Sequence, residues 1–376
     1  MLNKLLSLFS FDIGIDLGTA NTLVFVKGKG IQIREPSVVA KHKKTKQIIA
    51  IGDEAKRMLG KTPESILTIR PLKSGVIADF DATEAMIRYY IKQVHENSRG
   101  LAKFLAKPKV VIGIPSSVTE VERRAVWEAA LTAGAREAYL IEEPMASAIG
   151  EGISVFQSNG VMIVDIGGGT TEIAVISLGG IVVSRSLKVA GDDFDQAILH
   201  YMRVRHGLLI GERTAENIKM QIGSAYQLSA KKRALLEKKT EKQLEEEGEL
   251  ETKTSKGERL AIVRGRDIET GLPRSIRVSE SEIREALSSS LSQIVESIAD
   301  VLEDSPPELL TDILEKGILL TGGGALLAGL DQLIVDRVHI PVVVSDDPLT
   351  SVARGTGKVL MDDKLLERVK VVGGLT

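Results

Sequence analysis

The chain has 376 residues, of which 43% are hydrophobic and 27% are charged, and its formal net charge is −2. This length is enough for two domains with sizeable cores, and the near-neutral charge gives no electrostatic reason to expect nucleic acid as a partner. The sequence contains no cysteine, which excludes disulfides, thiolate metal sites and a cysteine nucleophile.

Residues 1–9 predict a short amphipathic helix. The apolar segment is too short for a signal peptide, and no apolar run in the chain reaches the ~20 residues that span a bilayer. Two interpretations stay open: the segment packs on its own domain, or it lies in a membrane interface. A single short helix would bind a membrane weakly, so the second interpretation implies avidity from an oligomer. The residues on its apolar face are Met1, Leu2, Leu5, Leu6 and Phe9.

Residues 13–26 predict a strand, a tight turn and a second strand, with Asp16 and Gly18 at the turn. The following segments to residue 51 indicate an antiparallel meander, then a helix at about 53–59, a loop at 71–79 and a helix at 81–97. Apolar Leu101 and Phe104 stand in a short basic connection after it. Burial explains them by default, and a membrane-dipping loop is the alternative.

Alternating strands and helices follow. Residues 109–114 predict a buried strand, and Thr119 opens a helix with a capping box. A strand at 138–141 leads into a helix that begins at Glu142-Glu-Pro, with proline near its first turn. This alternation predicts an α/β domain.

A second copy of the strand–turn–strand unit spans residues 161–176, and it aligns with the first copy without a gap. Asp165 falls on Asp16, and Gly167 falls on Gly18. Three successive glycines let backbone N–H groups approach an oxyanion, as in phosphate-binding nests. One such turn could be purely structural, but two copies predict related domains whose hairpins clamp one nucleotide. The two aspartates could face a divalent cation through water.

The rest of the chain predicts a helix at 191–205, strands near 262–264 and 275–278, and a helix at 279–302. Residues 230–259 are strongly charged and indicate an exposed helix or arm. The segment 317–326 repeats the strand–glycine-turn theme, enters a helix at 326–337 and contains no aspartate. Its small residues could let an adenine ring lie against the backbone. A helix at about 348–361 follows.

In this order the two Asp-x-Gly hairpins, the Glu-Glu-Pro helix start and the TGGGA turn resemble the actin-like ATPase superfamily. Within it, the chain closely resembles the bacterial actins of the MreB family. The resemblance covers nearly everything except about residues 229–260. The runs that carry it include IGIDLGTANTLVFVKGKGI, VVIGIPSSVTEVERRAV, IEEPMASAIG, DIGGGTTEIAVISLGGIV and TGGGALLAGLD.

The resemblance implies two duplicated ribonuclease-H-like α/β domains that face each other across a nucleotide cleft, each with an outer subdomain. The first half would be completed by a C-terminal helix, and the second would carry the charged insertion. The implied ranges are 10–150 with an outer subdomain at about 31–78 and the C-terminal helix at about 347–376, then 151–346 with an outer subdomain at about 190–278 and the insertion at about 229–260.

The resemblance also implies ATP and Mg²⁺ as cofactors. Glu143 would orient the attacking water with Thr170 beside the γ-phosphate, although Glu143 could instead only cap its helix, and Glu142 is the second candidate. Asp16 and Asp165 would orient hydrated Mg²⁺. The implied nucleotide contacts are Gly18, Thr19, Ala20, Asn21, Gly167, Gly168, Gly169 and Thr170 for the phosphates, Glu216, Asn217, Ile218 and Lys219 around the ribose, and Gly322, Gly323, Gly324, Ala325 and Leu326 for the adenine.

The implied function is a membrane-associated cytoskeletal filament that couples ATP hydrolysis to polymerisation and determines rod cell shape by organising peptidoglycan synthesis. The expected location is the inner face of the cell membrane. The expected partners are further copies of the chain, the membrane surface and membrane proteins of the cell-wall elongation machinery, without nucleic acid. A soluble small-molecule kinase of the same fold is the alternative, and it would need a second substrate pocket. A chaperone ATPase would need a substrate-binding region, for which the residues after about 360 leave no room.

Overall fold

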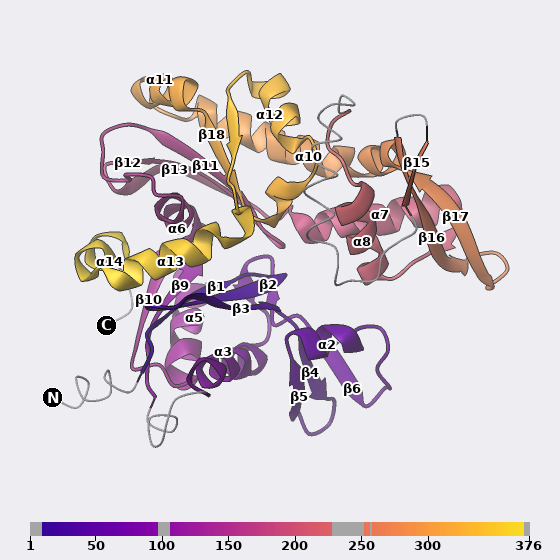
Figure 1. Ribbon diagram of the computed structural model, residues 1–376, viewed down its shortest axis with the longest axis horizontal. Coiled ribbons are helices and arrows are strands. Elements are labelled where there is room, and N and C mark those ends of the chain that lie inside the picture. The colour runs from indigo at the N-terminus through magenta and orange to yellow at the C-terminus, as the bar shows by residue number, and fades with distance from the viewer. Residues whose placement is uncertain (1–9, 97–105, 228–251, 256–257, 372–376) are drawn as a thin grey trace.

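The computed structural model describes residues 10–96, 106–227, 252–255 and 258–371. The candidate membrane contacts therefore lie outside the described residues, and they are Met1, Leu2, Leu5, Leu6, Phe9, Leu101 and Phe104. Two five-stranded sheets form the body of the molecule (Figure 1). None of the helices in the described ranges is both long enough and apolar enough to cross a membrane.

The first sheet has the strand order β10-β9-β1-β2-β3, with β1, β9 and β10 parallel and the β1–β2–β3 connections antiparallel. One face packs on helices α3 (Phe80–His95) and α5 (Glu120–Thr132) through a core that includes Tyr90. The other face packs on helices α6 and α13. The strands are β1 (Ile13–Leu17), β2 (Asn21–Val26), β3 (Gly30–Pro36), β9 (Lys109–Ile114) and β10 (Glu137–Glu142).

The second sheet repeats this arrangement with the order β19-β18-β11-β12-β13. Its outer face packs on α10 (Glu280–Glu303) and α12 (Leu330–Val338), and its inner face packs on α6 and α13. The identical strand order in the two sheets confirms the duplication predicted from the two hairpins. The strands are β11 (Val161–Ile166), β12 (Thr171–Ser177), β13 (Gly180–Leu187), β18 (Ile318–Thr321) and β19 (Val342–Val344).

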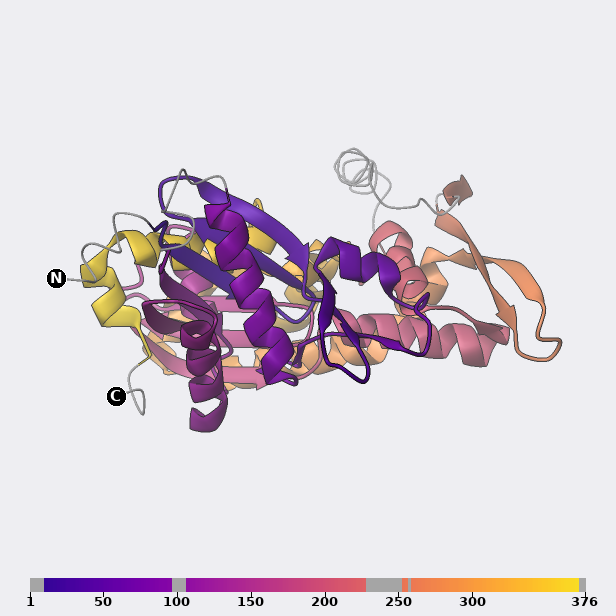
Figure 2. The ribbon, with the colours of Figure 1, turned by 90° about the horizontal axis from the view of Figure 1, so that it is seen from below.

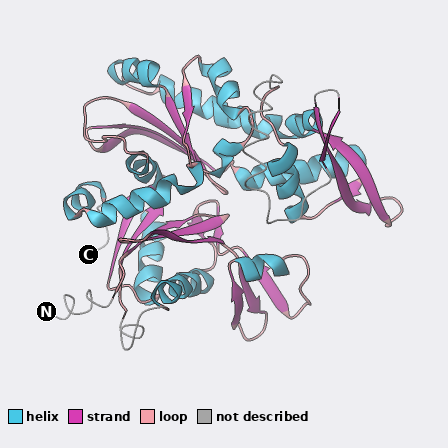
Figure 3. Ribbon diagram, in the orientation of Figure 1, coloured by secondary structure: helices cyan, strands magenta, loops and turns pink. Residues whose placement is uncertain are grey.

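Helices α6 (Glu143–Gly150) and α13 (Ser351–Met361) cross between the two sheets (Figures 1 and 3). Their backbones touch, because a Cβ atom added to Gly355 would lie 1.8 Å from the carbonyl oxygen of Ala146. A Cβ added to Gly150 would lie 1.9 Å from the carbonyl oxygen of Ser351. Glycine is therefore required on both helices at this crossing.

A smaller sheet projects from the first half, on the side away from the yellow helices near the C-terminus (Figure 2). The predicted meander was wrong in one respect: its last two strands leave the first sheet and pair with a third strand as β5-β4-β6. The predicted loop at 71–79 contains a short hairpin, β7–β8. The elements are β4 (Val39–His42), β5 (Ile48–Ile51), α2 (Asp53–Met58), β6 (Ile66–Ile69), β7 (Leu72–Lys73) and β8 (Val76–Ile77).

The projection from the second half combines two helices with a long antiparallel ribbon. Part of the stretch predicted to be a charged arm is folded, because Arg259 on β16 forms an ion pair of 3.3 Å with the buried carboxylate of Glu280. Two cations share that carboxylate, since Arg284 lies 3.2 Å from its other oxygen. The elements are α7 (Gly191–His206), β14 (Leu208–Leu209), α8 (Glu212–Ile222), β15 (Thr252–Ser255), β16 (Glu258–Asp267) and β17 (Pro273–Ser279).

The last third of the chain differs from the prediction at its helix starts. The helix expected from residue 326 begins at Leu330, after a 3-10 turn η1 (Gly323–Leu326), because Gly329 adopts a left-handed φ of 78°. The helix expected from residue 348 likewise opens with a 3-10 turn, η2 (Pro348–Thr350). Two helices were not predicted, α11 (Pro307–Lys316) and α14 (Asp363–Val369).

Candidate functional site

The two Asp-x-Gly hairpins occupy equivalent places in the two sheets. In the first, Asp16 pairs with Leu23 across β1 and β2. In the second, Asp165 pairs with Glu172 across β11 and β12. The same seven-residue offset in both registers confirms the gapless alignment of the two motifs.

The turns of the two hairpins lie against each other. A Cβ added to Gly168 would lie 2.5 Å from the Cβ of Ala20, and one added to Gly169 would lie 2.5 Å from the Oγ1 of Thr19. Any larger side chain at these glycines would push the turns apart. The structure thus brings together candidate phosphate-binding residues from distant parts of the chain, and their binding role stays a prediction.

Backbone amides at the hairpin turns are available to a ligand. Gly167 closes its own turn by donating to the carbonyl of Thr170 at 2.9 Å. The N–H groups of Gly168, Gly169 and Thr170 donate no hydrogen bond to any group in the described residues. Consecutive unpartnered amides form a cradle suited to phosphate oxygens.

Two carboxylates flank this cradle. Burial, with the negative charge of Asp165 beside it, raises the pKa of Asp16 to about 8. Burial also raises the pKa of Asp165, although two hydroxyl groups that donate to its Oδ2 atom oppose the shift. These are Ser147 Oγ at 2.5 Å and Thr321 Oγ1 at 2.8 Å. A pair of carboxylates whose ionised forms repel each other fits a divalent cation, and two protein oxygens with water suit Mg²⁺.

Glu143 lies at the start of α6 and faces the same carboxylates. Burial, and then the negative charge of Glu172, raise the pKa of Glu143 well above its ordinary range. Its carboxylate makes no hydrogen bond to a residue that the structure describes, so it is available to a water molecule or a ligand. The pKa of the neighbouring Glu142 is raised by burial, and Arg123 opposes that shift. Glu142 is therefore the less isolated of the two candidates.

Glu172 ties the two halves together behind the hairpins. Its fully buried carboxylate accepts hydrogen bonds from the backbone N–H and the Oγ of Ser116, at 3.1 and 2.6 Å. Ser116 follows β9 in the first half, whereas Glu172 belongs to β12 in the second. A third donor, the Oγ of Ser186, lies 2.5 Å from the other oxygen of this carboxylate.

The candidate ribose-binding residues lie on helix α8. Glu216 and Lys219 occupy one face, as their spacing predicted. Lys219 donates to the carbonyl of Gly191 at 2.8 Å and pairs with Asp195 at 2.9 Å. Ile218 is fully buried in the core of the second half, so it supports the helix rather than reaching a ligand. Asn217 is also buried, with 8% of its surface exposed.

The candidate adenine-binding turn lies beside the end of β11. Gly322 has a φ of 80°, which favours glycine. A Cβ added to Gly324 would lie 2.2 Å from the Cγ2 of Ile166. Glycine is therefore required at Gly324, and no side chain from this position can stand between the turn and a ligand. Ala325 is buried, whereas Leu326 is 47% exposed.

A family model described as MreB/Mbl protein matches residues 10–239 and 230–368. The chain belongs to the MreB/Mbl family. Cell shape-determining protein MreB of Escherichia coli strain K12 is 50% identical over 365 residues, 96% of either chain. Cell shape-determining protein Mbl of Bacillus subtilis strain 168 is 48% identical over 362 residues, which cover 96% of this chain and 99% of Mbl.

Solved structures of this MreB/Mbl family support the same assignment. The crystal structure of MreB5 of Spiroplasma citri bound to ADP has a TM-score of 0.81 and 36% identity to this chain, and it covers 96% of this chain and 98% of that one. A second MreB5 structure, bound to AMPPNP, matches equally well. Together with the two duplicated sheets, these matches confirm the actin-like ATPase fold that the sequence predicted.

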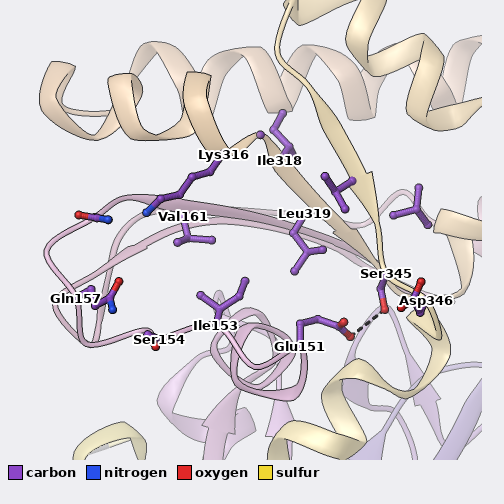
Figure 4. Close-up of a pocket in the computed structure, with 14 residues that line it drawn as sticks. Glu151, Ile153, Ser154, Gln157, Val161, Lys316, Ile318, Leu319, Ser345 and Asp346 are labelled. Carbon is purple, nitrogen blue, oxygen red and sulfur yellow. Dashed lines mark hydrogen bonds between the residues drawn. The ribbon is translucent and has the colours of Figure 1, made fainter.

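A separate cavity lies between the second sheet and the segment that follows α6 (Figure 4). Its volume is about 390 Å³. Its walls include Ile153, Val161 and Leu319, and none of the predicted site residues lines it. The carboxylate of Glu151 at its edge accepts a hydrogen bond from Ser345 at 2.9 Å. The cavity is therefore distinct from the hairpin site.

The two residues that donate hydrogen bonds to Asp165 were not predicted from the sequence. Ser147 lies one helical turn after Glu143, and that spacing was a signal for its position near the site. Thr321 ends β18, which runs parallel to β11 in a register that places it opposite Asp165. The TGGGA turn was predicted to serve only the base, but its first residue also holds the aspartate of the second hairpin.

Proposed function

We propose that this chain is an ATPase that binds ATP and Mg²⁺ between its two hairpins. The observation that carries the proposal is the unpartnered amide cradle at Gly168 and Gly169, held against the other hairpin beside Asp16 and Asp165. The crystal structures of Spiroplasma citri MreB5 with ADP and with AMPPNP support it. ATP would lie across both halves, with its ribose near Glu216 and Lys219.

Asp16 and Asp165 would hold Mg²⁺ through water, and Ser147 and Thr321 would keep Asp165 in place. The bound ion would neutralise charge on the phosphoryl group that is transferred. In hydrolysis, a bond forms between the oxygen of water and the γ-phosphorus, and the bond from that phosphorus to the β–γ bridging oxygen breaks. Glu143 would orient this water and accept its proton, with Thr170 beside the γ-phosphate.

We further propose that the chain forms homopolymer filaments that determine rod cell shape by organising peptidoglycan synthesis. The names of the Escherichia coli and Bacillus subtilis relatives, both cell shape-determining proteins, support this role. Head-to-tail contacts that do not close into a ring produce filaments. The domain division is proposed with it: halves at 10–150 and 151–346, with the C-terminal helix returning to the first half.

The filaments would lie at the inner face of the cell membrane and meet membrane proteins of the cell-wall elongation machinery. Apolar residues of the segment 1–9, with Leu101 and Phe104, would enter the lipid surface. Each contact is weak alone, and repetition along a filament would make binding strong.

The test is co-sedimentation with vesicles of phosphatidylethanolamine and phosphatidylglycerol in the presence of ATP, with electron microscopy of the pellets. The intact chain is compared with a chain lacking residues 1–9. Membrane-bound filaments that are lost on truncation would support both the cytoskeletal role and the anchor. Filaments that bind equally well after truncation would refute the anchor alone. No polymer at any protein concentration, together with phosphoryl transfer to a sugar, would support the kinase alternative instead.

A further inference from the structure

Two ion pairs join the outer parts of the two halves. Lys56 on α2 lies 3.3 Å from Glu216 on α8, and Arg70 after β6 lies 3.2 Å from Asp192 on α7. In Figure 1, α2 lies next to α8 and below α7, on the side of the molecule away from α14. In each pair the cation comes from the first half and the carboxylate from the second.

The first pair ends on the candidate ribose-binding helix. The Nζ atom of Lys56 lies 3.4 Å from Oε1 and 3.3 Å from Oε2 of Glu216, so it straddles the carboxylate. The other cation of that helix face, Lys219, is engaged by Asp195 within the second half. Lys56 is therefore the group that connects Glu216 to the first half.

The second pair ends on the support of a phosphate hairpin. The backbone N–H of Asp192 donates to the carbonyl of Gly168 at 2.7 Å, while its side chain holds Arg70. Five residues after Arg70, the backbone N–H of Gly75 donates to Thr19 Oγ1 at 3.1 Å. The segment 70–75 thus contacts Thr19 of the first hairpin directly and reaches the second hairpin through Asp192.

The two ion pairs are partly buried. The four side chains are 18 to 33% exposed, so the charges are only partly screened by solvent. Partly buried pairs attract more strongly than pairs on an open surface. Dissolved salt still reaches them and weakens the attraction.

We propose that Lys56 and Arg70 form a latch that retains the bound nucleotide. This inference rests on the proposed function, because it places the nucleotide between the hairpins and α8. A nucleotide held at the ribose by Glu216 and at the phosphates by the Gly168 turn leaves only when the two halves separate. Separation breaks both ion pairs. The latch therefore controls how long the nucleotide stays bound and takes no part in cleaving it.

The test measures release of a fluorescent N-methylanthraniloyl derivative of ADP from the full chain by stopped flow. Lys56→Gln and Arg70→Gln each remove one charge of the latch, and Lys56→Arg and Arg70→Lys retain it. Release should be about three- to tenfold faster for each glutamine variant and faster still for the double variant. The charge-retaining variants should release the nucleotide at nearly the native rate.

Matched controls exist in the same segment. Arg57 and Lys73 are exposed and lie close in sequence to Lys56 and Arg70. The side chains of Arg57 and Lys73 form no ion pair with any residue that the structure describes, so Arg57→Gln and Lys73→Gln should leave release unchanged. The dependence of release on salt concentration is a second measurement, and it can be made on the native chain without any substitution. Raising ionic strength should accelerate release from the native chain, and it should have a smaller effect on the double variant.

Single-turnover hydrolysis of prebound ATP separates retention from general damage. The proposal predicts an unchanged hydrolysis rate beside faster release, whereas a distorted site would lower both binding and hydrolysis. Release from the double variant within about twofold of native, with no response of the native chain to salt, would overturn the latch. Failure of the native chain to bind the nucleotide at all would overturn the proposed function, and the latch with it.

Discussion

The crossing of α6 and α13 allows a sharp prediction for Gly355→Ala. The new methyl carbon would lie 1.8 Å from the carbonyl oxygen of Ala146, about 1.6 Å short of the 3.4 Å at which an ordinary contact begins. Overpacking against backbone lowers the stability of the folded state by about 3 kcal/mol. Alanine has a better helix propensity than glycine, which raises that stability by about 1 kcal/mol. In a chain of 376 residues, the net loss of about 2 kcal/mol should lower Tm by about 2–3 °C.

Thermal unfolding followed by circular dichroism tests this prediction. Gly180→Ala is the control, because Gly180 is exposed at the start of β13, its φ is not positive, and the nearest atom to an added Cβ is the carbonyl oxygen of Ser177 at 4.0 Å. The control should keep nearly the native Tm. A Gly355→Ala chain that melts at or above the native temperature would show that helix propensity outweighs the contact, and the argument from close helix packing would be refuted.

Three further results are expected at the site and in the first half. Glu143→Gln should slow phosphate release from ATP about 10²- to 10⁴-fold with little change in nucleotide affinity, and an undiminished rate would exclude Glu143 as the base. Removal of Mg²⁺ with EDTA should weaken ATP binding in a fluorescence titration, because Asp16 and Asp165 would then repel the phosphates; equal affinity in EDTA would refute the metal assignment. Burial lowers the pKa of His95 below its ordinary 6.5. Below pH 6.5 the unfolded chain therefore binds a proton at this ring more readily than the folded chain does, and the free energy of unfolding falls as the pH is lowered; above pH 6.5 the ring is neutral in both states and has no such effect. Thermal scans between pH 7.5 and 5.5 should show a steeper loss for the native chain than for His95→Asn, and parallel curves would contradict this assignment.

The hairpins could be predicted from the sequence because their determinants are local. Strand alternation, an aspartate at the strand end and glycine at the turn all lie within a few residues of one another. The gapless alignment of Asp16 with Asp165 then implied the duplication, which the matching strand orders confirm.

The departure of β4 from the first sheet could not be predicted in this way. Alternating apolar residues indicate a strand without saying which sheet it joins. In the structure the chain leaves the first sheet at Ser37, whose Oγ donates to the carbonyl of Gly18 at 2.6 Å. That hydrogen bond joins residues 19 positions apart, and the alternation of apolar residues does not predict it.

The residues that surround the site were hidden for the same reason. Lys56 meets a carboxylate 160 positions away, and Thr321 meets one 156 positions away. Such contacts follow from how the two halves fold together. The resemblance supplied the residues that would face the nucleotide, and it gave no signal for the charged pairs that join the outer subdomains.

The glycine crossing of α6 and α13 also has a mechanical consequence. The chain passes between the halves through α6 and returns to the first sheet through α13, and backbone atoms block any sliding of one helix along the other. The crossing therefore opposes sliding of the halves more than it opposes a twist of one half relative to the other, like the blades of scissors. The outer subdomains lie at the far end of those blades in Figure 1, so they would travel farthest in such a twist. If the nucleotide binds between the hairpins as proposed, a load applied to the outer subdomains would act as a torque on the nucleotide site.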